Sequence, residues 1–420
     1  MQVGEFNQWT LQKPPQKNES KISMPDFAIQ GKTMTDNEEE IELMVIAVQT
    51  ITVAQLMTSV SDLFIECLGD TSRVFTQVAS PENATPQSLV FLATSKSIAA
   101  GVKSPALIWV VGRKAKEAAV AAATAGQTIV VVKNVERAMA QTIHTFFLQT
   151  PYTNRAIQGI HPTAIIAESA KLGLDVRVGP NVFIGQNVCV GERVYIGANS
   201  VIEDQSTIGD DCVIHPLVFI GHSTLIGKRC EVHPSSVIGK EGYGYAHDEL
   251  GNHYRIPHQG RVVLEDDVHI GSKNTIDRGT FGETRLRAGA KLDNKIHIAH
   301  NCDIGENSLI TSGFGIAGSS KIGANFITGG NSSVGGHLDV CANVHLAGES
   351  SISKSVSVPG QYGGYPTQPL QKYIKTKVAI LHLVEMQKQL KLVLKHLGLE
   401  SKVSEPLSAV RGQTDVATDQ

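Results

Sequence analysis

Histidine and glycine residues recur at multiples of 18 positions in the second half of the chain. His300 is followed 18 positions later by Gly318, and 36 positions later by Gly336, whose neighbour is His337. If residues 18 apart stack, an imidazole, an open backbone N–H and a second imidazole share one edge of the fold. These groups are the minimum for acyl transfer, because the imidazole accepts the proton of an attacking amine and the N–H binds the oxyanion.

A carboxylate precedes this set by about one hexapeptide. Asp293 is placed on the strand adjoining that of His300. A carboxylate near an imidazole fixes its tautomer and raises its basicity, so Asp293 is the candidate orienting partner of His300. The spacing alone leaves one alternative open, a set of surface histidines at polar corners.

A hexapeptide repeat predicts the stacking. Between Ile160 and Val358 an aliphatic residue recurs every six positions, apart from the stretch 242–261 and a four-residue insertion between Ile276 and Leu286; 29 of 30 such positions are Ile, Leu or Val, with Thr328 as the polar exception. The next position is very often Gly, and the position four after the aliphatic is small or β-branched. A fixed short period of this kind is typical of a solenoid.

Each hexapeptide is expected to form one short strand and one corner, and three of them close a triangular coil. The repeat therefore predicts a parallel β-helix of about ten coils. The aliphatic and small residues point inward, while Gly, Asn and Asp are expected at corners because they tolerate positive φ. The phase is lost over 242–261, which is expected to leave the coil as a loop, and the repeat ends at Pro359 and Gly360.

The chain divides into five predicted segments. Residues 1–45 form a disordered tail, 46–155 an α/β nucleotide-binding domain, 156–366 the β-helix, 367–400 a C-terminal helix and 401–420 a loose tail. The α/β domain is predicted from apolar runs at 89–92, 106–111 and 128–132 with a helix at 115–125. In the C-terminal helix an apolar seam with 4-3-4-3-4 spacing predicts packing on other helices, or on its own subunit; it consists of Ala379, Leu383, Met386, Leu390, Val393 and Leu397.

The composition narrows the class of protein. A formal net charge of -3 gives no basic excess for nucleic acid. Six cysteines without a CxxC pair predict buried free thiols and a reducing compartment. No signal peptide and no apolar run of about 18 residues is found, so the expected location is the cytoplasm. No metal site and no cofactor is expected.

Several segments resemble, in order over about residues 50–395, the signatures of the UDP-3-O-acylglucosamine N-acyltransferase family of hexapeptide-repeat acyltransferases. They are Asp277-Arg278-Gly279, Leu292-Asp293-Asn294, Ile298-Ala299-His300-Asn301, Gly336-His337, Gly242-Tyr243-Gly244-Tyr245-Ala246 and Tyr365-Pro366-Thr367-Gln368-Pro369. The hand of the helix comes from this resemblance, which implies a mainly β chain with a left-handed parallel β-helix.

The resemblance also implies an activity. The donor would be a 3-hydroxyacyl chain on acyl carrier protein, and the acceptor the 2-amine of UDP-3-O-acylglucosamine, in lipid A biosynthesis. His300 would be the general base, Asp293 its orienting partner and Gly318 the oxyanion donor. The family is a homotrimer with active sites between neighbouring prisms, which agrees with the helical seam.

Substrate-binding residues follow from the same resemblance. His337 would contact the nucleotide phosphate, and Phe91 and Asn301 are the further candidates. Thr94 and Ser97 stand where the family has a second stacking ring and an amide, so uridine binding is expected to be weaker or built differently. Residues 349–354 are polar where the family lines its acyl groove, which predicts a shorter or more polar acyl chain unless the alignment is shifted.

Three other readings remain open. The first is a coenzyme-A-dependent N-acetyltransferase on another nucleotide sugar. The second is a non-catalytic trimeric paralogue that acts as a scaffold. The third is a metal site like that of γ-carbonic anhydrases, for which His253 and His258 have suggestive spacing in the loop that leaves the coil.

Overall fold

The computed structural model describes residues 50–124, 126–147, 158–363 and 370–398. It divides into two compact units, Met1–Leu148 and Gln149–Gln420. The predicted tails at 1–45 and 401–420 and the Tyr365-Pro369 segment lie outside the described residues.

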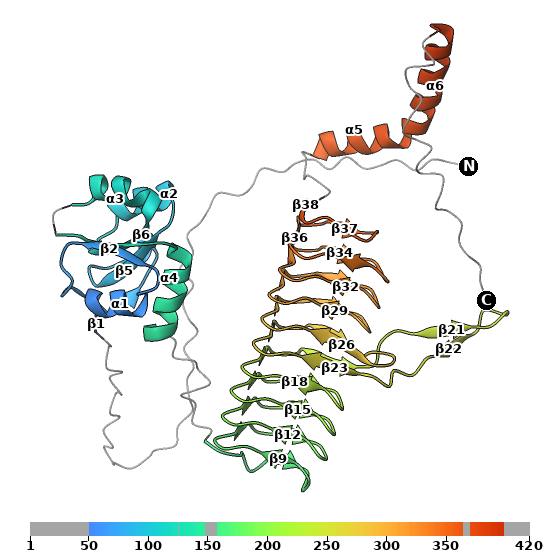
Figure 1. Ribbon diagram of the computed structural model, residues 1–420, viewed down its shortest axis with the longest axis horizontal. Helices are drawn as coiled ribbons and strands as arrows, with labels where there is room; N and C mark the ends of the chain where they lie inside the picture. Colours follow the sequence, from blue (N-terminus) through green and yellow to red (C-terminus); the bar gives the residue numbers. More distant parts are fainter. Residues whose placement is uncertain (1–49, 125, 148–157, 364–369, 399–420) are drawn as a thin grey trace, which may run out of the picture. The chain divides into compact units, whose positions relative to one another are not determined.

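The first unit is a five-stranded sheet with helices, as the apolar runs predict (Figure 1). The strand order is β2-β7-β6-β5-β4, and all neighbours are parallel except β2 and β7. Alternate residues of the central strands enter two separate apolar cores. The strands are β1 (Ile51–Thr52), β2 (Phe64–Leu68), β3 (Val74–Phe75), β4 (Gln77–Val78), β5 (Ser88–Leu92), β6 (Ile108–Gly112) and β7 (Thr128–Val132), and the helices are α1 (Val53–Ser59), α2 (Ser95–Val102), α3 (Lys116–Ala122) and α4 (Val135–Thr142).

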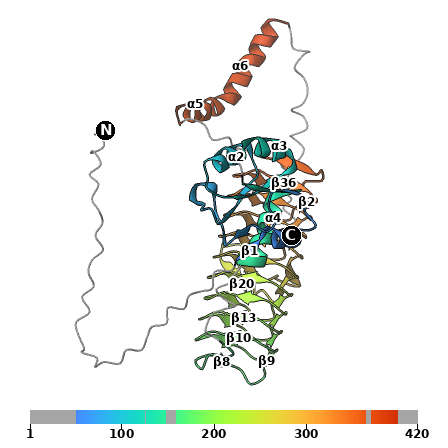
Figure 2. The same cartoon turned by 90° about the vertical axis from the view of Figure 1, so that its left-hand side faces the viewer.

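The second unit winds into a prism with three long parallel sheets as its faces (Figures 1 and 2). The first face consists of β10 (Arg177–Val178), β13 (Tyr195–Ile196), β16 (Val213–Ile214), β19 (Glu231–Val232), β24 (His269–Ile270), β27 (Lys291–Leu292), β30 (Leu309–Ile310), β33 (Ile327–Thr328), β36 (Val344–Leu346) and β38 (Gly360–Tyr362). The second face consists of β8 (Ile165–Ile166), β11 (Phe183–Ile184), β14 (Val201–Ile202), β17 (Phe219–Ile220), β20 (Val237–Lys240), β25 (Thr275–Asp277), β28 (His297–Ile298), β31 (Gly315–Ile316), β34 (Ser333–Val334) and β37 (Ser351–Ile352). The third face consists of β9 (Lys171–Leu172), β12 (Cys189–Val190), β15 (Thr207–Ile208), β18 (Leu225–Ile226), β23 (Arg261–Leu264), β26 (Glu283–Leu286), β29 (Asp303–Ile304), β32 (Lys321–Ile322) and β35 (Asp339–Val340).

The register confirms that residues 18 apart stack. Val178 pairs with Ile196 on the first face, and His297 pairs with Gly315 on the second face. The aliphatic residues of the repeat fill the interior, and nearly all of them are buried. Thr328 is buried as well, and its hydroxyl oxygen accepts a hydrogen bond from the N–H of Thr311 at 3.0 Å, so the one polar entry is satisfied.

The role predicted for the corner residues is confirmed for asparagine and aspartate, but only in part for glycine. Positive φ falls three positions after the aliphatic residue, where Asn and Asp are frequent, as at Asn181 (φ 56°), and where glycine stands only at some corners, as at Gly313 (φ 78°). The glycines directly after the aliphatic residue are required for another reason. A Cβ on Gly209 would lie 2.6 Å from the carbonyl oxygen of Gly227 in the next coil, so a side chain there would push two coils apart.

The break over 242–261 leaves the prism, as predicted. It contains an antiparallel hairpin of β21 (Tyr245–His247) and β22 (His253–Arg255), which projects between β20 and β23 (Figure 1). The coil resumes with Leu225 paired to Val263, so the excursion does not disturb the stacking.

The predicted single C-terminal helix is broken. It forms α5 (Leu370–Leu381) and α6 (Leu383–His396), with His382 between them at ψ 0°. Most of the predicted seam lies on α6, where Leu383 and Leu390 are 61% and 56% exposed. The described part of the chain therefore leaves this apolar seam uncovered.

All six cysteines are free thiols, as predicted, but only three of them are buried. Cys212, Cys230 and Cys302 point into the prism, whereas Cys189 is exposed on the third face. None of the helices in the described residues is both long and apolar enough to cross a membrane. The predicted fold class, a mainly β chain with a left-handed parallel β-helix, an N-terminal α/β domain and a C-terminal helical segment, is confirmed.

The close approach of the coils predicts a contrast between two glycines. Gly209→Ala should destabilise the fold by about 1–3 kcal/mol, because its Cβ meets backbone that cannot move aside. Gly315→Ala should be nearly neutral, since a Cβ there has nothing within 4 Å. Thermal unfolding of both variants measures the difference, and equal losses would contradict this account of the corners.

Candidate active site at a corner of the prism

His300, Gly318 and His337 lie at one corner, after three successive strands of the second face. They follow β28, β31 and β34 respectively. Backbone hydrogen bonds join the coils here: the N–H of Ser319 donates to the His300 carbonyl at 2.9 Å, and the N–H of His337 donates to the Gly318 carbonyl at 3.0 Å. The predicted edge with an imidazole, a glycine and a second imidazole therefore exists.

The His300 ring lies directly against Gly318. A Cβ on Gly318 would be 2.7 Å from both Cε1 and Nε2 of His300, so only glycine leaves room for the ring. Within the described chain the Gly318 N–H has no protein acceptor. Other corner amides are capped by side chains, as the N–H of Gln186 is by Asp204 Oδ1 at 2.7 Å. The residue in the capping position for Gly318 is Gly336, which has no side chain to offer.

Asn301 fixes the tautomer of His300. The Asn301 Oδ1 atom accepts the N–H of Thr280 at 2.9 Å, and its Nδ2 atom donates to the Phe281 carbonyl, so the orientation of the amide is set by backbone partners. The same Oδ1 lies 3.2 Å from His300 Nδ1. An amide oxygen only accepts, so Nδ1 carries the proton and Nε2, the atom beside Gly318, keeps a lone pair.

Asp293 is not brought to His300. It follows β27 of the first face, so it occupies a different corner of the coil from His300. Its Oδ2 accepts the N–H of Ser312 at 3.2 Å and its Oδ1 accepts from Asn294 Nδ2 at 2.6 Å. The residue that orients the imidazole within one chain is Asn301, which the sequence suggests only as a substrate contact.

The loop that carries the hairpin returns a second histidine to the site. His258 is 2% exposed and packs edge-on against His300, with ring centroids 5.1 Å apart. Its Nδ1 lies 3.0 Å from the Ile256 carbonyl and therefore carries the proton, while its buried Nε2 has no partner among the described residues. Burial lowers the pKa of His258 despite the opposing hydrogen bond to Ile256, and His300 lowers it further.

A cavity of about 430 Å³ opens beside these residues along the second face. Its walls include His297, His300, Gly315 and Gly318, with Tyr243 from the loop. Asp277 is buried at its edge, where it pairs with Lys240 Nζ at 2.5 Å and lies 3.7 Å from His297 Nε2. Most of the remaining lining is aliphatic, which suits an acyl chain.

The predicted nucleotide-binding residues lie in two places. His337 is exposed at the corner one coil beyond Gly318. Phe91, on β5 of the first unit, is partly buried and packs on an apolar core. Thr94 and Ser97, expected at the positions of a second stacking ring and an amide, form the capping box of α2: the Thr94 N–H donates to Ser97 Oγ at 2.8 Å, and the Ser97 N–H donates to Thr94 Oγ1 at 3.1 Å.

A second hollow, of about 780 Å³, lies at the carboxyl ends of β5, β6 and β7 in the first unit. Thr94 lines it together with Arg113, Lys114 and Lys133. Ligands of open parallel sheets bind at this edge, and three cations there suit an anionic group.

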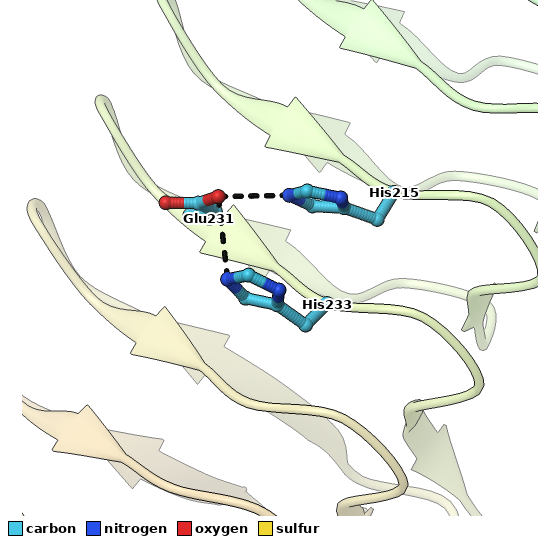
Figure 3. Close-up of side chains that lie close together, drawn as sticks. All are labelled: His215, Glu231 and His233. Atoms are coloured by element: carbon cyan, nitrogen blue, oxygen red, sulfur yellow. Dashed lines mark hydrogen bonds and ion pairs between the residues drawn. The ribbon is translucent and has the colours of Figure 1, made fainter. Parts of the chain in front are cut away.

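The metal ligands suggested by spacing are not brought together. The Nδ1 atoms of His253 and His247 lie 2.7 Å apart across the hairpin, while His258 packs on His300. A different group, absent from the predicted site residues, gathers on the first face: His215, Glu231 and His233 (Figure 3). The 18-residue interval between the two histidines is the signal in the sequence that could have found it.

The lowered pKa of His258 predicts a pH effect on stability. Below about pH 6.5, the ordinary pKa of histidine, the unfolded chain protonates at this residue before the folded chain does, so the folded state loses stability as the pH falls. His258→Gln removes this loss, so the stability of the native protein relative to the variant should fall as the pH drops. Thermal unfolding across this pH range measures the difference; a pH-independent offset between the two proteins would exclude the effect.

Comparison with known proteins finds relatives that match part of the chain. A family model described as the GMPPB C-terminal domain matches residues 160–276, which end before Asp293 and His300. The UDP-3-O-acylglucosamine N-acyltransferase of Desulfotalea psychrophila is 53% identical over 154 residues, 37% of this chain and 45% of the relative. That of Wolinella succinogenes is 41% identical over 145 residues, 34% of this chain and 46% of the relative.

Two acyltransferases are among the solved structures that match part of the chain. The UDP-N-acetylglucosamine acyltransferase of Campylobacter jejuni is 24% identical with a TM-score of 0.36, over 48% of this chain and 69% of that chain. LpxA from Acinetobacter baumannii is 26% identical with a TM-score of 0.38, over 49% and 71%. The chain spans less than half the length of the curated relatives named above. Over about a third of its own length, the chain is a homologue of the UDP-3-O-acylglucosamine N-acyltransferase family, which its motifs predict.

Proposed function

We propose that this protein is an N-acyltransferase. It transfers a 3-hydroxyacyl group from acyl carrier protein to the 2-amine of UDP-3-O-acylglucosamine, a step of lipid A biosynthesis. One observation carries the proposal: the unprotonated Nε2 edge of His300 lies against Gly318, whose N–H has no acceptor in the described chain. The name of the curated relatives supplies the acceptor.

The chemistry needs one base and one oxyanion donor. His300 Nε2 takes the proton of the acceptor amine as the nitrogen attacks the thioester carbonyl. The Gly318 N–H donates a hydrogen bond to the oxyanion that forms. When the tetrahedral intermediate collapses, the C–S bond breaks and the His300 imidazolium returns its proton to the leaving thiolate, which balances the reaction. Asn301 holds the ring in the tautomer that this cycle requires.

The acceptor and the acyl chain have separate candidate places. The cavity along the second face takes the acyl chain, because Ala299, Ile316, Ala317 and Val334 give it an aliphatic wall and Gly315 leaves its floor open. His337 contacts the nucleotide phosphate from the next coil. In the first unit, Phe91 stays the stacking candidate for a base; it does not line the basic hollow, whose three cations suit an anionic group.

The assembly is a homotrimer in this proposal. The exposed seam of α6 provides the apolar contact between copies. A trimer also gives Asp293 a place in catalysis: within one chain it lies at another corner, so only Asp293 of a neighbouring copy could orient His300. The cytoplasm is the proposed location. The proposed acyl donor and the nucleotide-sugar acceptor are found there, and no cysteine of the chain is paired.

Removal of the base tests the function. His300→Ala should lower turnover of UDP-3-O-acylglucosamine by at least about a hundredfold, the usual contribution of a general base. His247→Ala, on the exposed hairpin, is the matched control and should keep full activity. Mass spectrometry of the acylated product measures both. An active His300→Ala variant rejects the assigned base, and an inactive native protein favours the scaffold paralogue.

The same assay decides the donor. Acyl carrier protein loaded with a 3-hydroxyacyl chain should support turnover, and acyl or acetyl coenzyme A should not. A preference for acetyl coenzyme A would replace the proposal by the N-acetyltransferase alternative.

The helical seam predicts the oligomeric state. Replacing Leu383 and Leu390 together by Asp should dissociate the trimer, because the charges enter an apolar contact. Replacing Lys388 and Lys395 by Gln changes the charge of the same helix by the same amount on its other side and should leave the trimer intact. Light scattering measures the mass; a trimer that survives the Leu replacements shows that the seam is dispensable.

A further inference from the structure

Three potential ligand atoms converge on the first face of the prism (Figure 3). Glu231 Oε1 lies 2.8 Å from His215 Nε2 and 3.3 Å from His233 Nε2. All three residues offer a ligand atom within 4.8 Å of the others, and no other described group of three His, Cys, Asp or Glu residues does so. Two imidazole nitrogens and one carboxylate oxygen are a donor set that divalent transition metals prefer.

The repeat itself places these residues. His215 and His233 follow β16 and β19, so the 18-residue period stacks their rings with centroids 4.3 Å apart. Glu231 points outward from β19, toward both rings (Figure 3). The side chain of His215 is 3% exposed, whereas those of Glu231 and His233 are 33% and 42% exposed. One ligand is therefore rigidly held, and the open side admits an ion and its waters.

Glu231 has no Lys or Arg within ion-pair distance among the described residues, unlike two other carboxylates of the prism. Asp211 pairs with Arg193, and Asp303 pairs with Arg287. Glu231 is half-buried, yet its only ion-pair partners among the described residues are the two histidines. A bound divalent ion would place positive charge directly against this half-buried carboxylate.

We propose that His215, Glu231 and His233 bind one divalent transition-metal ion of the Zn²⁺ class. The two rings lie 15° from parallel, so the Nε2 atoms of both cannot point at one ion in this conformation. The more exposed His233 ring rotates when the ion binds, while buried His215 stays in place. Three protein ligands leave the remaining coordination position to water.

The ion joins two successive coils of the prism. It lies after the first face, whereas His300 lies after the second face and further along the prism, so this site is independent of the proposed acyltransferase activity. An ion that binds only the folded chain stabilises it by mass action. Its role is therefore to hold the early coils in register.

The hairpin offers a competing site that the test must exclude. His247 and His253 lie Nδ1 to Nδ1 at 2.7 Å on an exposed hairpin, where a surface pair could take up added metal. His253→Ala removes this pair without touching the prism. Glu231→Gln keeps the shape of the proposed ligand and a hydrogen-bond acceptor for the histidines, so this variant should fold like the native chain.

The experiment uses the full chain, stripped of metal with a chelator and titrated with Zn²⁺ by calorimetry and with Co²⁺ by absorbance. The native chain and His253→Ala should each bind one tightly held ion per chain and unfold at a higher temperature when Zn²⁺ is present. Glu231→Gln and His233→Ala should bind at least about tenfold more weakly and lose the thermal shift. Circular dichroism checks that each variant is folded.

Each alternative result overturns the proposal. Equal binding by Glu231→Gln and the native chain would place the ion elsewhere. Loss of the tight ion in His253→Ala would assign it to the hairpin. Absence of tight binding in the native chain would leave Glu231 as an acceptor of two imidazole hydrogen bonds and nothing more. None of these outcomes bears on the activity, which His300→Ala tests separately.

Discussion

The contact between successive coils governs the rest of this structure. The short strands pair with those of the next coil in register, with one shift between Ile238 and Lys240, and the glycines after the aliphatic residues let the backbones meet where a Cβ would collide. A side chain on a face is therefore placed by its position in the repeat. Because the backbone of the prism is fixed by this stacking, chemistry depends on which residue types occupy one corner in neighbouring coils.

The corners of the prism differ in whether a side chain of the next coil caps their backbone N–H groups, and this difference bears on where a site can form. Where the next coil supplies a carboxylate, as Asp204 does for Gln186, the outward N–H is occupied. Where it supplies glycine or alanine, the N–H stays open to solvent, so an open amide is not by itself a site. Gly318 differs because the His300 imidazole lies against it and Asn301 sets the tautomer of that ring. The site combines an uncapped amide with one positioned imidazole.

The sequence predicts the contacts that follow from the 18-residue period. It does not predict the contacts made by segments that lie outside the repeat. The stacking of His300 on Gly318 follows from counting, because the strands between them are regular. Asp293 was expected beside His300, but nearness in sequence means a neighbouring corner and not contact. His258 reaches His300 only through the return path of the hairpin, which has no period to count. Asn301 is an orienting residue because an irregular turn at Thr280 and Phe281 fixes its amide, and the repeat gives no sign of that.

The two histidine clusters of the prism show one rule with opposite outcomes. His215 and His233 occupy equivalent positions in adjacent coils, so their rings stack and share one carboxylate. His300 has glycine in the equivalent position of the next coil, so its ring covers a bare backbone instead of another ring. A side chain at position 318 would fill the space beside the His300 ring, which the proposed reaction needs. Histidine over histidine thus gathers potential ligand atoms, whereas histidine over glycine leaves open space beside the imidazole.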